Sequence, residues 1–149
     1  MLGETAVVEL LQKTIEAYRP QAEEQKIKLS CDCHPPALIK VDADRLRRVF
    51  TNLLDNAIKY TAENGDVTIR VRETEEEIVI HFKDKGGGIA PEELPYIFDA
   101  FHRAESQKKS GGHGLGLAAV KAIIQGHGGR VSVNSKPGKG SVFTVHLPK

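Results

Sequence analysis

Asp84 stands just after the apolar run of residues 78–82 and is followed by Lys85 and three glycines. Glycine has no Cβ, so the backbone beside Asp84 can take unusual conformations and lie close to a ligand. A carboxylate at the end of a strand can accept a hydrogen bond from an amino group. Residues 84–89 therefore suit a flat heterocycle with an exocyclic amine. The same pattern also fits a tight turn after an edge strand, so its meaning depends on the other motifs.

Asn52, Asn56 and Lys59 follow one another at steps of four and three residues. On an α-helix these steps place them within about 60° of one another. Two amide oxygens and an ammonium on one face could hold Mg²⁺ and the phosphates that it bridges. The alternative is an ordinary solvated helix face, although asparagine is a poor helix former and two of them lower helix stability.

A glycine-rich run at residues 111–117 leads into an apolar helical pattern. Glycines that open a helix leave its first N–H groups free, and these groups with the helix dipole form an anion site. A flexible linker before a helix is the alternative. The preceding segment contains Arg103, Lys108 and Lys109 and has little apolar periodicity, which is typical of a lid over phosphates.

The elements that must position these motifs follow from hydrophobic periodicity. Helices are predicted over residues 4–26, with Pro20 interrupting the pattern, over 43–61, capped by Asp42, and from 118 to the glycines that begin at 126. A helical turn is predicted at residues 91–94. Strands are predicted over residues 27–33, 38–41, 67–72, 77–83, 130–135 and 141–147. The strands 67–72 and 77–83 are expected to form an antiparallel pair that places Asp84 at its end.

Composition describes one ordinary domain of 149 residues, with 40% hydrophobic and 28% charged residues. The net charge of +1 gives no electrostatic reason to expect nucleic acid as a partner. We find no membrane span and no signal-peptide pattern, so we expect a cytoplasmic chain. Cys31 and Cys33 alternate on a predicted strand, and we expect reduced thiols there rather than a metal site.

Taken together, the order of the motifs resembles the catalytic, ATP-binding domain of bacterial sensor histidine kinases, in the GHKL superfamily. The resemblance rests on the asparagine helix, Asp-x-Gly-x-Gly-Ile at 84–89, Ile-Phe-Asp-x-Phe at 97–101, the basic lid, and Gly-x-Gly-Leu-Gly-Leu at 112–117. It covers nearly the whole chain, and residues 1–149 are expected to form a single catalytic domain. The fold so implied is an α+β two-layer sandwich of the Bergerat type. About three helices would pack on one face of a mixed, mostly antiparallel sheet, which agrees with the interspersed order of helices and strands.

The resemblance implies ligands for Mg²⁺ and for the phosphates of ATP. Asn56 would bind Mg²⁺ with Asn52 assisting, while Lys59 and Tyr60 would reach the phosphates. Arg103, in a lid over about residues 99–113, would meet the terminal phosphate. The second glycine box would surround the phosphates with Gly112, His113, Gly114, Leu115, Gly116 and Leu117.

The resemblance also implies an adenine pocket. Asp84 would accept a hydrogen bond from the adenine amino group, and Thr144 would join the adenine through water. Phe98 and Phe101 would anchor the lid. The walls of the pocket would be formed by Gly86, Gly88 and Ile89.

The reaction implied is phosphoryl transfer. Hydrolysing relatives carry a glutamate at the position of Asn52, and an amide cannot accept a proton from water. The γ-phosphoryl would therefore pass to a histidine on a separate dimerisation domain of the same parent kinase, with Lys59 and Arg103 offsetting its charge. None of the six histidines has the setting of that acceptor, so we expect no self-phosphorylation. A response regulator would be an indirect partner, the isolated domain a monomer, and the parent a membrane-anchored sensor.

Two other readings share the same pocket. One is a serine kinase of the anti-sigma type, and the other is a nucleotide-sensing module without transfer. His113 also departs from the Thr or Ser usual in the second glycine box. As a hypothesis, this histidine makes nucleotide affinity rise as the pH falls through the histidine range. Equal affinity at pH 8 and pH 6 would count against it.

Overall fold

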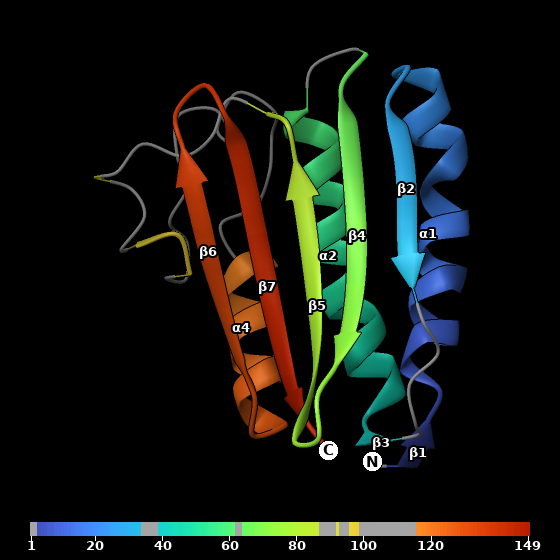
Figure 1. The fold of residues 1–149 in the computed structure, drawn as a ribbon, viewed down its shortest axis with the longest axis vertical. Coiled ribbons are helices and arrows are strands. Elements are labelled where there is room, and N and C mark those ends of the chain that lie inside the picture. Colours follow the sequence, from blue (N-terminus) through green and yellow to red (C-terminus); the bar gives the residue numbers. More distant parts are fainter. Residues whose placement is uncertain (1–2, 34–38, 62–63, 87–91, 93–95, 99–115) are drawn as a thin grey trace.

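A five-stranded sheet forms one layer of the molecule (Figure 1). The computed structural model describes residues 3–33, 39–61, 64–86, 92, 96–98 and 116–149. The strands lie in the order β2-β4-β5-β7-β6, and only the pair β2 and β4 is parallel. Their bounds are Lys28–Cys33 (β2), Asp66–Glu73 (β4), Glu77–Asp84 (β5), Arg130–Lys136 (β6) and Gly140–Pro148 (β7).

Helices form the second layer, and all of those described lie on one face of the sheet (Figure 1). They are α1 (Val7–Glu24), α2 (Ala43–Tyr60) and α4 (Gly116–Gly126). The central helix α2 contacts both α1 and α4 and also packs on β5. The predicted α+β sandwich with a mixed, mostly antiparallel sheet is confirmed.

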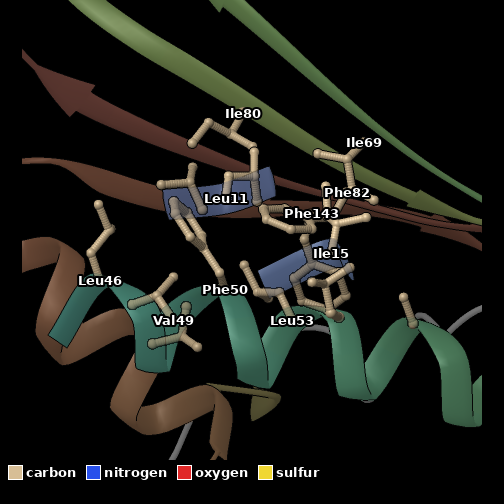
Figure 2. Close-up of a cluster of buried hydrophobic side chains, with 14 of the residues drawn as sticks. Leu11, Ile15, Leu46, Val49, Phe50, Leu53, Ile69, Ile80, Phe82 and Phe143 are labelled. Carbon is tan, nitrogen blue, oxygen red and sulfur yellow. The ribbon is translucent and has the colours of Figure 1, made fainter. Parts of the chain in front are cut away.

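The core lies between the two layers (Figure 2). The apolar stripe predicted for α2 supplies Phe50 and Leu53, which lie close to Leu11 and Ile15 of α1. The Phe50 and Phe82 ring centroids lie 6.1 Å apart, which couples α2 to β5. Each such side chain contributes roughly 1.5–3 kcal/mol by leaving water, so this packing fixes α2 against the sheet.

The start of α2 is held by specific hydrogen bonds. Asp42 caps the helix as predicted, because its Oδ1 accepts the backbone N–H of Arg45 at 3.1 Å. The Asp42 N–H donates to Nε2 of His127 at 2.9 Å, and Nδ1 of His127 lies 2.8 Å from the Ile123 carbonyl oxygen. Since a carbonyl only accepts, Nδ1 carries the proton. His127 therefore links the end of α4 to the start of α2.

The start of the chain differs from the prediction. The helix expected from residue 4 begins at Val7, because Gly3–Thr5 form strand β1. This strand pairs antiparallel with β3 (Ile39–Val41) in a separate small sheet. Pro20 lies within α1 on its exposed side and does not end the helix.

The cysteines differ as well. Cys31 and Cys33 form a disulfide within β2, where we expected reduced thiols. Alternate residues of a strand point to the same side, and the 5.7 Å between the two Cα atoms lies within the range for disulfides. In the described part of the chain, no helix is both long and apolar enough to cross a membrane.

Candidate functional site

The Asp84 carboxylate is buried at the end of β5, on the side of the sheet that faces the helices. Its Oδ1 accepts the backbone N–H of Gly86 at 2.9 Å. Burial raises the pKa of Asp84, and hydrogen bonds from the backbone N–H groups of Gly86 and Ser141 partly oppose this. A carboxylate kept in a site that favours its neutral form is a strong acceptor for a ligand N–H group.

Gly140 forms one wall of the Asp84 site, because it lets β7 pass directly beside the end of β5. Its φ is +90°, in the left-handed region that favours glycine. A Cβ built at this position would overlap the carbonyl oxygen of Asp84 and lie 3.0 Å from the Cα of Lys85. No side chain fits there, and the sequence analysis did not identify this glycine as part of the site.

Thr144 does not lie where the resemblance placed it. It pairs with His81 across β5 and β7, and its Oγ1 lies 3.1 Å from Nδ1 of His81. Because alternate strand residues face opposite sides, this hydroxyl is on the open face of the sheet, away from the Asp84 carboxylate. This position does not support the adenine contact predicted for Thr144.

Ser141 is the hydroxyl residue that stands beside Asp84. The two residues are paired in the β5–β7 register, and Ser141 is buried. Its Oγ lies 2.8 Å from Oγ of Ser135 on β6. Counting the alternation of β7 from Phe143, whose ring faces the core, would have assigned Ser141 to the site and Thr144 to the other face.

The polar face of α2 reaches the first turn of α4. Nδ2 of Asn52 donates to the Gly116 carbonyl oxygen at 3.2 Å. Since the amide nitrogen faces that carbonyl, Oδ1 of Asn52 remains available as a ligand or acceptor. The predicted association of the asparagine helix with the second glycine box is present at these two residues, while Leu117 is buried in the core.

Asn56 and Lys59 lie on the same helix as Asn52, one and two turns further on. Asn56 is half-buried, and its side chain makes no hydrogen bond with the described residues. Lys59 forms an ion pair with Asp55, with its Nζ 3.0 Å from Oδ2. The backbone of Tyr60 ends α2.

The end of α2 also meets the glycine segment that follows Asp84. Thr61 and Gly86 form an isolated antiparallel bridge. The Thr61 hydroxyl donates to the Ala57 carbonyl oxygen at 2.7 Å, which fixes the turn after the helix. This contact brings Asp84 and the asparagine face of α2 to one end of the molecule, and Thr61 was not singled out from the sequence.

The segment before the predicted lid is anchored on the sheet. Ile97 is buried, and Phe98 packs against Phe143 with ring centroids 6.2 Å apart in a T-shaped arrangement. Phe98 is thus part of the outer core near Ser141 rather than a free side chain. The remaining predicted site residues and the lid lie outside the described residues: Gly88, Ile89, Phe101, Arg103, Gly112, His113, Gly114 and Leu115.

Asn52 and Asn56 have the chemistry that Mg²⁺ requires, because the ion prefers oxygen ligands and retains several waters. The described residues include no cluster of three His, Cys, Asp or Glu side chains that could hold a metal. A magnesium site here would therefore depend on amide oxygens, on phosphate oxygens of a ligand and on water.

The family comparison assigns the class of protein. The family of histidine kinase-, DNA gyrase B- and HSP90-like ATPases matches residues 41–149, and the chain belongs to this family. It is an ATP-binding catalytic domain of the sensor histidine kinase type.

Individual relatives agree with that class. Sensor protein SrrB of Staphylococcus aureus is 39% identical over 145 residues, which cover 96% of this chain and 25% of SrrB. The chain thus spans about a quarter of the length of the curated relatives that it matches. Among solved structures, the catalytic domain of histidine kinase ThkA has a TM-score of 0.89 at 25% identity, covering 100% of this chain and 98% of that domain. Full-length ShkA in complex with AMPPNP has a TM-score of 0.86 at 31% identity, covering 99% of this chain and 31% of ShkA.

Proposed function

We propose that this chain binds Mg²⁺-ATP at the Asp84 site and donates the γ-phosphoryl to a histidine on a separate dimerisation domain of its parent kinase. The buried Asp84 carboxylate carries the proposal, because it accepts the Gly86 N–H at the end of the molecule where α2 presents its asparagines, and Gly140 lies against the Asp84 backbone. A parent kinase anchored in a membrane, with this domain in the cytoplasm, is consistent with the greater length of the sensor relatives.

Each residue of the proposed site has a distinct part in this proposal. Asp84 accepts a hydrogen bond from the adenine amino group, and Ser141 takes the neighbouring position that the resemblance assigned to Thr144. Lys59 and Arg103 balance the charge of the transferred group. Bound Mg²⁺, held by Asn56 with Asn52 in support, supplies further electrostatic stabilisation of the phosphates.

Transfer is favoured over hydrolysis because Asn52 offers no base. Its amide already donates to the Gly116 carbonyl and cannot take a proton from water. During transfer the bond between the γ-phosphorus and the bridging oxygen of ADP breaks, and a bond to the acceptor imidazole nitrogen forms. The sensor kinases among the relatives favour a histidine acceptor over the serine of an anti-sigma kinase.

Calorimetric titration with AMPPNP and Mg²⁺ tests the nucleotide site. We expect binding by the unmodified chain and a loss of at least about tenfold in affinity for Asp84→Ala, since the adenine amino group loses its charged acceptor. Asp44→Ala is the control, because this substitution removes the same charge from a side chain that is 90% exposed in the first turn of α2. Equal affinity of Asp84→Ala and Asp44→Ala, with both variants folded, would overturn the assignment of the adenine site.

A further inference from the structure

No described helix covers the other face of the sheet (Figure 1). This face carries a cleft of about 420 Å³ over β4 and β5. Cations and polar groups line it: Arg70, Arg72, Lys83, Lys85, His81, Thr68 and Asp66, with Val142 at the side. It lies on the opposite face from the Asp84 carboxylate, so it is distinct from the proposed nucleotide site.

The cleft concentrates positive charge in a nearly neutral chain. The chain has 21 Lys and Arg residues and 20 Asp and Glu residues. Four of the basic residues and one acidic residue line the cleft, so the rest of the chain has a net charge of −2. The excess of cations at this place is therefore local and not a property of the whole surface.

The strand register places these cations beside one another. Arg70 stands opposite His81, and Thr68 stands opposite Lys83, so Arg70 and Lys83 are diagonal neighbours at about 7–8 Å. Arg70 and Arg72 lie two residues apart on the same strand, at about 7 Å. A single anion of modest size could therefore contact several of these cations at once.

Most of the cleft's positive charge is not neutralised by the protein. Lys85 pairs with Asp66, with its Nζ 3.0 Å from Oδ2. Arg70, Arg72 and Lys83 make no ion pair with any residue that the structure describes. Asp32 stands beside Arg70 in the β2–β4 register, but it does not line the cleft.

The lining also indicates the kind of ligand. Among the described residues, no aromatic ring other than the His81 imidazole lines the cleft, and Val142 is its only apolar side chain. Bases are usually held on aromatic rings, and protein interfaces are built around apolar and aromatic anchors. A cleft of this size and charge instead suits a small ligand, because arginine binds phosphate through two parallel hydrogen bonds.

We propose that this cleft binds a small ligand with two or more phosphate groups, held by Arg70, Arg72 and Lys83. Such a ligand would bridge the cations across β4 and β5. It would act at a second site of the domain, separate from the one that holds ATP.

Inorganic pyrophosphate is the probe for this site. Isotopically labelled protein is titrated at constant ionic strength, and NMR follows the His81 imidazole and the side-chain N–H groups of Arg70 and Arg72. We expect saturable shifts at all three residues. We also expect the pKa of His81, which burial and the charges of Arg72, His146 and Arg70 now lower, to rise when pyrophosphate is bound.

Paired variants locate the binding. Arg70→Gln/Arg72→Gln should weaken pyrophosphate binding by about tenfold or more, since two charge-assisted contacts are lost. Arg45→Gln/Arg47→Gln on α2 removes the same charge from exposed positions and should leave the affinity unchanged. If pyrophosphate bound only at the nucleotide site, the NMR signals of His81 would not shift, and Arg70→Gln/Arg72→Gln would bind pyrophosphate as tightly as the control variant. That result would overturn the proposal. If citrate bound as tightly as pyrophosphate, the proposal that the ligand carries phosphate groups would be overturned.

Discussion

At the scale of single residues, Asp84 combines two properties that oppose each other. Its position at the edge of the core suits ligand recognition, but burial makes the ionised carboxylate costly for the fold. Functional sites often keep such a group at the expense of stability. An asparagine in place of Asp84 would keep a side-chain oxygen that can accept the Gly86 N–H, but it would carry no charge.

Asp84→Asn should therefore raise the melting temperature at neutral pH while weakening nucleotide binding. Burial raises the pKa of Asp84 in the folded protein. Protonation of Asp84 therefore stabilises the fold fully below its unfolded pKa of about 3.9, and this stabilisation is lost as the pH rises through the folded pKa. The advantage of the variant should then be smallest near pH 4 and reach a plateau above the folded pKa. Thermal unfolding of both proteins between pH 4 and pH 8 measures this, with Asp44→Asn as the exposed control. An advantage independent of pH would contradict it.

At the scale of elements, the β6–β7 hairpin shapes the site through a close backbone approach. Gly140 and Gly138 both have positive φ, at +90° and +78°. A Cβ at Gly140 would overlap the backbone of Asp84, whereas a Cβ at Gly138 would meet no atom within 4 Å. Alanine substitutions at the two glycines can therefore separate the cost of the positive φ from the cost of the steric clash.

Gly140→Ala should destabilise the domain by at least about 2 kcal/mol more than Gly138→Ala, since only the first must move β7 away from β5. It should also weaken nucleotide binding, because that movement displaces Asp84. Chemical denaturation gives the free energies of unfolding, and calorimetry gives the affinities. Equal destabilisation by both variants would mean that β7 adapts without strain at Asp84.

Other element contacts hold the two halves of the site together. Asn52 joins α2 to the start of α4, and His127 joins the end of α4 to the start of α2. The Thr61–Gly86 bridge joins the end of α2 to the segment after β5. The groups that we propose for adenine and for phosphate therefore come from elements that contact one another.

At the scale of the whole molecule, the proposed function makes this chain the donor side of a transfer reaction. The described histidines are already engaged: His81 with Thr144, His127 between two helices, and His146 with Glu77. With labelled ATP, the isolated chain should incorporate no acid-labile phosphate. Addition of the dimerisation domain of the parent kinase should yield phosphohistidine on that domain. Acid-stable label on a serine would instead favour the anti-sigma reading, and binding without any transfer would favour a sensing module.

Local pattern in the sequence determined the helices, most strand bounds, the Asp42 cap and the family of the domain, because periodicity and glycine motifs act over short distances. Only the tertiary structure decided the parallel pairing of β2 with β4, the closeness of Gly140 to Asp84, and that Ser141 and not Thr144 pairs with Asp84. These features depend on which distant strands pair and in which register, and a shift of one residue turns every side chain to the other face. The cationic cleft has the same origin, since its arginines and lysines come from two strands and meet only when β4 pairs with β5.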